Sequence, residues 1–246
     1  MELLSKLEAP SNRLNGSQLP PQLARRRGQI GDTPVELTTR RYTGPVLESL
    51  TFASISDADD RCRSLTLIGF PRPGSPVPIL GVDLIAFRGA LSLVALDYAP
   101  TSQSYWADVA APILGEIRER ALPPLKLRKR PDFTRDAFSE LALIAASPRG
   151  TEDTACQAAS SLFEAYLGLV KQSPSRPTQT GDRTVAQWCE AELRNRKEHD
   201  ALARVFGPHF ADAYLRFLFT PAGVSSSATP VHQPNNDHRS NHHVGH

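Results

Sequence analysis

The sequence is poor in cysteine, in aromatic residues and in net charge. Its 246 residues include three cysteines, 7% aromatic residues and a formal net charge of +2. The cysteines (Cys62, Cys156 and Cys189) lie far apart and form no C-x-x-C pair, which argues against a zinc or iron–sulfur site and is typical of a reducing compartment. The net charge is small, and no basic stripe is interleaved with aromatic residues. We therefore do not expect a nucleic-acid-binding protein.

Long apolar runs are also missing, with one exception. Residues 77–96 approach the length of a membrane span, but they contain Asp83, Arg88, a proline and two glycines, so we interpret them as the core of a sheet. Residues 1–10 lack the apolar segment of a signal peptide. With 40% hydrophobic and 22% charged residues, the composition is that of a soluble globular protein.

The first half of the chain is typical of strands in series. Apolar and β-branched residues alternate between turn signals, and we predict strands at 35–42, 47–55, 63–70, 79–87 and 90–98. The proline-bearing stretch 70–76 is a loop, and Arg88-Gly89 is a two-residue hairpin turn.

The second half has helical spacing. We predict helices at 104–121, 151–170, 184–206 and 208–219, with a short helix or irregular packing segment at 133–146. Strands followed by helices, with connections too short for crossovers, predict an α+β fold: a three-layer α/β/α sandwich with a central antiparallel sheet flanked by helices. We expect one domain at 34–220, an N-terminal extension with a short helix at 1–33, and a disordered, polar, histidine-rich tail at 221–246.

An acid stands out within the most apolar stretch of the chain. If the hairpin turn has two residues, Phe87 pairs with Ala90 and Ile85 with Ser92. This register puts four side chains on one face: Asp83, Ile85, Ser92 and Val94. One acid and one hydroxyl on an apolar wall suit a ligand with a large apolar body, and apolar surroundings would let Asp83 donate a proton near neutral pH. The alternative is an aspartate that bonds backbone amides at a strand end.

A set of motifs around Asp83 resembles a known family. The run Phe70-Pro71, then 78–84 (P-I-L-G-V-D-L), then 94–100 (V-A-L-D-Y-A-P) resembles the signature of ferredoxin-dependent bilin reductases. The second half agrees in order and nearly in spacing, with Trp188 where the family pattern has tyrosine. Its matching residues are Phe138-Ser139, Trp188-Cys189, Asn195, Lys197, Phe206-Gly207, Tyr214 and Leu218-Phe219. The resemblance covers about residues 35–220.

The resemblance implies a mechanism and partners. Such enzymes bind an open-chain tetrapyrrole, here biliverdin IXα, between the sheet and the C-terminal helices. They hold no metal or flavin and take single electrons from a reduced 2Fe-2S ferredoxin. A second bilin reductase that receives the product is a further partner, and we expect a monomer in the cytoplasm, or in the plastid of a eukaryotic alga or plant. Asp83 matches the proton donor, and Ser92 and Lys197 match residues that bind propionates. The substrate-binding set is therefore Thr66, Ile85, Ser92, Val94, Asn195, Arg196 and Lys197.

Two positions depart from the family pattern. Thr66 stands where many members carry histidine or asparagine, and Arg196 where many have a second aspartate, which arginine cannot replace as a proton donor. Asp200, one helical turn later, is a weaker substitute. We therefore expect a single two-electron reduction at the 15,16 methine bridge, giving 15,16-dihydrobiliverdin. The alternatives are A-ring or four-electron reduction (phytochromobilin or phycoerythrobilin synthesis), a bilin carrier without turnover, or a plain α+β domain with chance matches.

The remaining charged groups have plainer interpretations. The basic run Lys126, Arg128, Lys129 and Arg130 is either a solvated loop or a docking site for an acidic ferredoxin. Asp97 closes a strand and is expected to be structural. His199 and His209 are expected on helix surfaces. The tail histidines (His232, His238, His242, His243 and His246) are too irregularly spaced to indicate a specific metal site.

Overall fold

A twisted antiparallel sheet runs through the centre of the molecule. The computed structural model describes residues 14–59, 61–135, 137–173 and 182–221. Within them nine strands pair in the order β1-β3-β4-β5-β6-β7-β9-β8, and β2 pairs with β3 beside β1. The strands are β1 (Asn15–Ser17), β2 (Arg25–Ile30), β3 (Thr33–Thr43), β4 (Leu47–Asp57), β5 (Cys62–Pro71), β6 (Ile79–Phe87), β7 (Ala90–Ala99), β8 (Lys126–Leu127) and β9 (Leu143–Ala146).

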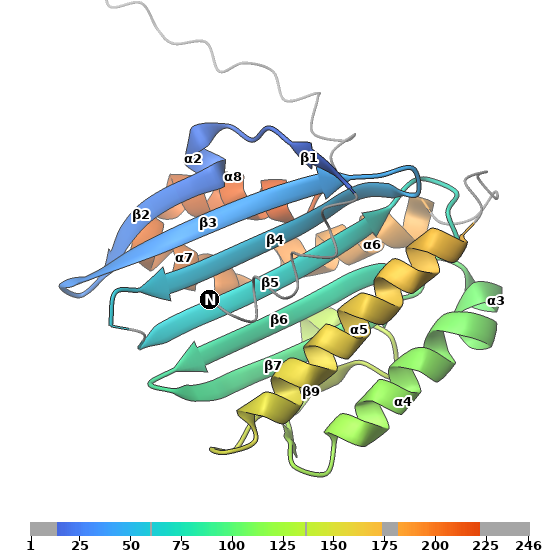
Figure 1. Ribbon diagram of the computed structural model, residues 1–246. Coiled ribbons are helices and arrows are strands. Elements are labelled where there is room, and N and C mark those ends of the chain that lie inside the picture. The colour runs from blue at the N-terminus through green and yellow to red at the C-terminus, as the bar shows by residue number, and fades with distance from the viewer. Residues whose placement is uncertain (1–13, 60, 136, 174–181, 222–246) are drawn as a thin grey trace, which may run out of the picture.

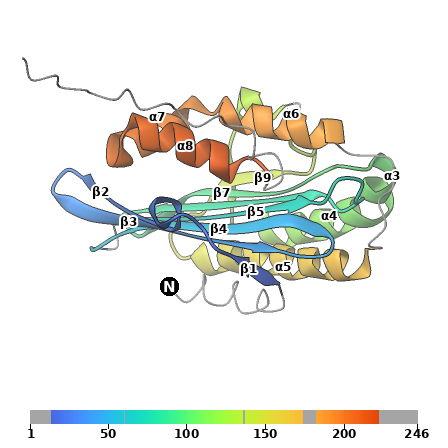
Figure 2. The ribbon, with the colours of Figure 1, turned by 90° about the horizontal axis from the view of Figure 1, so that it is seen from above.

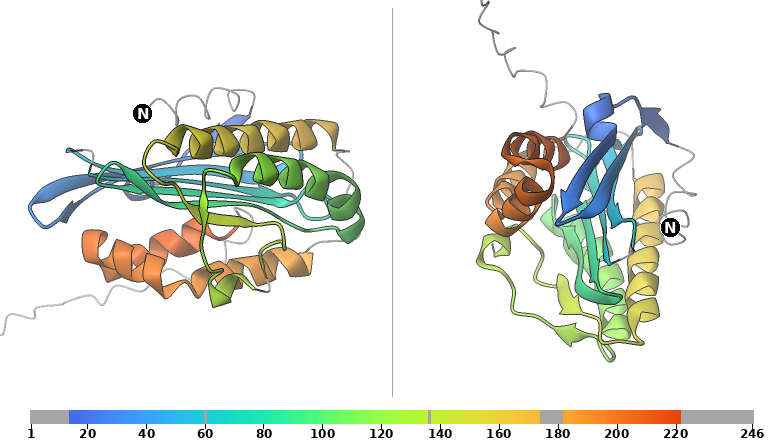
Figure 3. Two further views of the ribbon diagram at one scale, coloured as in Figure 1. Left: turned by 90° about the horizontal axis from the view of Figure 1, so that it is seen from below. Right: turned by 90° about the vertical axis from the view of Figure 1, so that its left-hand side faces the viewer.

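Helices cover both faces of this sheet. One face carries α4 and α5, and the other carries α6, α7 and α8 (Figures 1 and 2). The helical segments are α2 (Pro21–Ala24), α3 (Gln103–Tyr105), the π-helical η2 (Trp106–Ala110), α4 (Ala111–Ala121), the 3-10 turn η3 (Asp132–Thr134), α5 (Glu152–Gln172), α6 (Asp182–Leu193), α7 (Arg196–Phe206) and α8 (Pro208–Leu218). The three layers are also separate in the end-on view of Figure 3, so the predicted α/β/α sandwich is confirmed.

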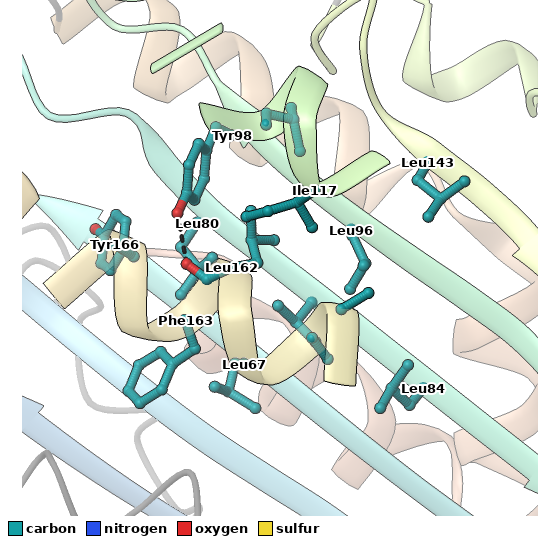
Figure 4. Packing of buried hydrophobic residues seen from close by; sticks show 14 of the residues in the cluster. Leu67, Leu80, Leu84, Leu96, Tyr98, Ile117, Leu143, Leu162, Phe163 and Tyr166 are labelled. Atoms are coloured by element: carbon teal, nitrogen blue, oxygen red, sulfur yellow. Dashed lines mark hydrogen bonds between the residues drawn. The ribbon is translucent and has the colours of Figure 1, made fainter. Parts of the chain in front are cut away.

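The larger hydrophobic core lies between the sheet and the helices α4 and α5. Leu67, Tyr98, Phe163 and Tyr166 are buried in it (Figure 4). The Tyr98 hydroxyl donates a hydrogen bond to the main-chain oxygen of Leu162, which ties β7 to α5. The buried side chains of this core hold α4 and α5 against the sheet.

A second core lies between the sheet and the helices α6 to α8. It is built around Trp188 of α6, whose ring contacts Phe70 at 5.4 Å between ring centroids and stacks on Phe138. On α8, Tyr214 is buried and its hydroxyl hydrogen-bonds the Thr39 hydroxyl at 2.8 Å. These contacts dock the C-terminal helices onto the sheet.

The hairpin between β6 and β7 has the predicted two-residue turn. Arg88 and Gly89 both have positive φ, 51° and 75°, the pattern of a turn whose twist matches a β-hairpin. Phe87 pairs with Ala90, as expected.

The predicted register beyond that turn was wrong. A bulge lies between Ile85 and Ala86, so Ile85 pairs with Leu93 and not with Ser92. One inserted residue reverses the side-chain alternation that follows it. Val94 therefore points into the α4–α5 core and is fully buried there, which removes it from the predicted substrate-binding set.

Three further boundaries differ from prediction. The segment 133–146 ends in strand β9, because the otherwise open edge of β7 is paired by Leu143, Ile144 and Ala145. The predicted helix 184–206 is two helices, because Asn195 leaves the helical conformation (φ −71°, ψ 81°) and begins α7. The predicted N-terminal extension contains the short helix α2, but it also supplies β1 and β2, so the boundary at residue 34 is too late.

The tail 222–246, with its five histidines, lies outside the described residues. Among the helices of the described part of the chain, none is both long and apolar enough to cross a membrane.

Candidate active site

A cavity of about 930 Å³ lies on the α6–α8 face of the sheet. Strands β3 to β7 form its floor, α7 and α8 form one wall, and the segment 128–133 forms the opposite wall. Most of the lining is apolar, with Leu37, Ile55, Leu93, Leu202 and Phe206 among the contributors. Its size suits an organic ligand with an extended apolar body.

Most of the predicted substrate-binding residues line this one cavity. They are Thr66, Ile85, Ser92, Asn195, Arg196 and Lys197, and the predicted proton donor Asp83 lines the same cavity. The floor residues come together because alternate side chains of β5 and β6 point to the same face of the sheet. The structure therefore brings these predicted residues together around one cavity, whereas Val94 lies in the other core.

Asp83 lies in the floor of the cavity, opposite Thr66 on the neighbouring strand. The two are direct partners in the β5–β6 ladder, and the Thr66 hydroxyl donates a 3.0 Å hydrogen bond to Oδ1 of Asp83. Burial raises the pKa of Asp83 to about 6, and the hydrogen bond from Thr66 opposes that rise. A carboxyl group in this state can hold a proton near neutral pH and release it to a bound ligand.

Ser92 reaches the cavity through the bulge. Its hydroxyl donates a 3.0 Å hydrogen bond to the main-chain oxygen of Ile85, which stabilises the irregular backbone at this point. The hydroxyl oxygen can still accept a hydrogen bond from a ligand.

The residues that begin α7 place a second acid in the cavity, one that the sequence reasoning missed. Glu198 lines the cavity and accepts a 3.2 Å hydrogen bond from the side-chain amide of Asn195. Burial and then the charge of Asp83 raise the pKa of Glu198 to about 8, although the Asn195 hydrogen bond lowers it. The helical periodicity of the sequence could have indicated this position, because residues 198, 202 and 205 are spaced so that they lie on one face of a helix.

Of the two residues noted in this segment, Arg196 lies at the rim of the cavity and Asp200 lies outside it. The side chain of Arg196 is 80% exposed and lies 4.0 Å from Asp200, which is itself 55% exposed. Asp200 also bonds the Nδ1 of His199 and does not line the cavity. Asp200 is therefore not the substitute acid, and the second acid that lines the interior of the cavity is Glu198.

Cations surround the mouth of the cavity from two sides. Arg128, Lys129 and Arg130 lie on the loop side, and Arg194, Arg196 and Lys197 lie on the helix side. Lys126, the first residue of the predicted docking run, is exposed in β8 and does not line the cavity. A mouth of this charge favours the carboxylates of a ligand or an acidic partner.

Asp97 holds the loop side of the cavity in place. It is 3% exposed and accepts hydrogen bonds from the Ser139 amide, at 2.9 Å, and from the Ser139 hydroxyl. Arg130 donates to the main-chain oxygen of Ser139. Burial raises the pKa of Asp97 to about 6. The structural role expected for Asp97 is thus the anchoring of the segment that carries Arg128 to Phe133.

Neither histidine of the described residues lines this cavity. His199 bridges Asp200 and Asp212 at 3.0 Å each, joining α7 to α8, and His209 is exposed. Over the described ranges, no three His, Cys, Asp or Glu side chains are grouped so as to hold a metal ion.

Comparison with known proteins gives a family match over most of the chain. The model of the family described as ferredoxin-dependent bilin reductase matches residues 4–220.

Individual relatives are more distant. A phycocyanobilin:ferredoxin oxidoreductase of Trichodesmium erythraeum is 32% identical over 161 residues, 61% of this chain and 62% of the relative, so the chain spans less than two thirds of that protein. A 15,16-dihydrobiliverdin:ferredoxin oxidoreductase of Nostoc punctiforme is 23% identical over 87% of this chain and 92% of its own length. The crystal structure of tomato phytochromobilin synthase in complex with biliverdin superposes with a TM-score of 0.69 at 18% identity, covering 89% of this chain and 82% of that one.

Proposed function

The chain belongs to the ferredoxin-dependent bilin reductases, and from this we propose that it reduces an open-chain tetrapyrrole with electrons from reduced ferredoxin. The observation that carries the proposal is Asp83, a carboxyl group with a pKa near 6 in the floor of an apolar cavity. A proton placed on a conjugated bilin lowers the energy of adding an electron, so a donor of this pKa supports reduction at neutral pH.

The cavity also fits the shape and charge of such a substrate. The apolar floor suits the pyrrole rings, and the cations at the mouth, Arg128 and Lys197 among them, suit two propionate groups. No cofactor bound to the chain is required, because a 2Fe-2S ferredoxin supplies one electron at a time. In this proposal an acidic ferredoxin docks near the loop that carries Arg128, Lys129 and Arg130, because the charges of the two surfaces are complementary.

The substrate and product that we propose are biliverdin IXα and 15,16-dihydrobiliverdin. Thr66 and Arg196 stand where other family members have further acid–base groups, which favours a single two-electron step. The name of the Nostoc relative is consistent with this product.

A second candidate is a four-electron or A-ring reduction. The presence of Glu198 in the cavity favours it, because a second acid could protonate a second position of the bilin. The name of the Trichodesmium relative, a phycocyanobilin:ferredoxin oxidoreductase, is consistent with this candidate.

One anaerobic assay distinguishes these outcomes. The protein is mixed with biliverdin IXα, reduced ferredoxin is added with a regenerating system, and the absorbance is followed while products are separated against standards. A blue-shifted product that coelutes with 15,16-dihydrobiliverdin supports the two-electron reaction, because reduction of the bridge shortens the conjugated system. A product reduced in the A-ring supports the second candidate. Binding without turnover would make the protein a carrier, and no binding would overturn the proposal.

A further inference from the structure

One face of α7 points into the cavity. Glu198, Ala201, Leu202, Val205 and Phe206 line the cavity, at intervals of three and four residues that place them on a single helix face. The opposite face carries Asp200 and Arg204, where the Arg204 side chain donates a hydrogen bond to the main-chain oxygen of Asp200. Glu198 is therefore the polar start of an otherwise apolar stripe that covers the cavity.

Three acids line the cavity within the described residues: Asp83, Asp132 and Glu198. Asp132 is 81% exposed and pairs with Arg135, so it belongs to the solvent-facing side of the loop. Asp83 and Glu198 face the interior from opposite sides, one from the floor and one from the helix wall. Their charges interact, since the carboxylate of Asp83 raises the pKa of Glu198.

The surroundings of Glu198 favour its protonated form. Asp83 on β6, Glu192 on α6 and Tyr214 on α8 act on it or respond to its charge. Glu192 is 7% exposed, and its pKa is raised well above the ordinary value by burial and then by the charges of Glu198, Asp83 and Asp97. Asn195 is the one side chain that hydrogen-bonds the Glu198 carboxyl group among the described contacts, and a single amide does not offset this environment.

We infer that Glu198 is a second proton donor of this site, which supplies from α7 the acid that Arg196 does not. The inference rests on the proposed function. Asp83 donates the first proton and Glu198 the second, while two reduced ferredoxins each give one electron and are oxidised. Two O–H bonds of carboxyl groups break and two C–H bonds form across one double bond of the bilin, which gains two electrons and two protons. Solvent protons at the cavity mouth then restore both carboxyl groups.

The alternative reading of Glu198 is structural. A glutamate in the first turn of a helix interacts favourably with the helix N-terminus and could serve only to begin α7. A matched pair of variants separates the two roles. Glu198→Gln keeps the shape and an oxygen that accepts the Asn195 hydrogen bond but cannot donate the proton. Asp200→Asn makes the same change on the outer face of the same helix.

The test is single-turnover reduction of bound biliverdin, followed by absorbance and by electron paramagnetic resonance. In Glu198→Gln we expect biliverdin binding within about threefold of wild type, a bilin radical that persists after the first electron, and a final step slowed about 100-fold or more. Asp200→Asn should behave as wild type. An unchanged final step in Glu198→Gln overturns the inference.

An infrared measurement needs no turnover. The wild-type minus Glu198→Gln difference spectrum at pH 7 should contain the carbonyl stretch of a protonated carboxyl group, and its absence would contradict the inference. If the wild-type protein does not reduce biliverdin, the proposed function is wrong. If the wild-type protein and the Glu198→Gln variant reduce biliverdin equally well, the proposed function stands and only the inference about Glu198 is wrong.

Discussion

The Thr66 hydroxyl donates a hydrogen bond to Asp83 across the β5–β6 ladder, at 3.0 Å between Oγ1 and Oδ1. The bond stabilises the carboxylate form of Asp83, whereas burial stabilises the protonated form. The two effects together set the pH at which Asp83 holds its proton. Thr66 is therefore a positioning residue that tunes the pKa of the acid beside it.

Replacing Thr66 tests this relationship. Because the reaction needs protonated Asp83, its rate should fall as pH rises through the pKa of that group. In Thr66→Val the falling limb should move to higher pH by about one unit, since a hydrogen bond to a charged group contributes about 1.5 kcal/mol and one pKa unit corresponds to 1.36 kcal/mol. The pH profile of the single-turnover rate measures this. Thr38→Val removes a comparable hydroxyl pair with Ser54 outside the cavity and should leave the limb in place; an equal shift in both variants would contradict the account.

Stability of the ligand-free protein should decrease as pH rises. Asp83, Asp97, Glu192 and Glu198 all have pKa values raised in the folded state. A raised folded pKa contributes stability that is complete below the unfolded value, about 4, and is lost as pH rises through the folded value. The loss therefore begins near pH 4 and is complete at about pH 6 for Asp97 and at about pH 8 for Glu198. Urea unfolding should therefore give a free energy lower by a few kcal/mol at pH 8.5 than at pH 5.

Glu192→Gln is the informative variant for this pH dependence. Because the amide carries no charge at any pH, the variant should lose less stability than wild type between pH 5 and pH 8.5. An identical pH dependence in the two proteins would remove Glu192 from the explanation.

Two glycines of the sheet should respond differently to the same substitution. A Cβ atom at Gly69 would lie 2.7 Å from the Tyr166 hydroxyl oxygen, and the Tyr166 ring is fully buried in the α4–α5 core. Gly69→Ala should lower the free energy of unfolding by about 1–3 kcal/mol through overpacking. A Cβ atom at Gly81, on the next strand, meets nothing within 4 Å, so Gly81→Ala should change stability by no more than about 0.5 kcal/mol. Denaturant titration of both variants compares them, and equal losses would contradict the packing described for Tyr166.

Lys197 should recognise a carboxylate of the substrate. Lys197→Met should raise the Kd for biliverdin about fivefold, which corresponds to about 1 kcal/mol for a solvated charge pair. Binding of biliverdin dimethyl ester, which lacks the carboxylates, should hardly change. Lys171→Met, at the exposed end of α5 on the other face of the sheet, serves as the control. A loss of affinity for the ester as large as that for biliverdin would indicate a packing role for Lys197 instead.

The parts of the fold that local chemistry determines could be predicted from the sequence. The bounds of β6 were predicted to the residue, because its alternation ends at a turn for which Arg88-Gly89 is suited. The existence of five central strands and the helices α4, α5 and α8 followed from periodicity. These elements are long and strongly patterned, so tertiary contacts had little to override.

The features that the sequence did not reveal depend on contacts between distant segments. The Ser92 hydroxyl on the partner strand stabilises the bulge beside Ile85. Because no local sequence pattern indicates this bulge, Val94 was assigned to the wrong face of the sheet. The break at Asn195 lies in a polar run without glycine or proline. Glu198 was overlooked because the family comparison drew attention to residue 196, whereas the helix places residue 198 toward Asp83.

Asp83 is the residue on which the proposed chemistry depends, and Asp83→Asn tests it most directly. The amide preserves the shape of the side chain but cannot donate the proton. In an anaerobic single-turnover experiment with biliverdin and reduced ferredoxin, we predict that the variant binds biliverdin within about threefold of wild type and forms product about 100-fold more slowly or not at all. The same product formed at the wild-type rate would contradict the assignment of Asp83 as the proton donor.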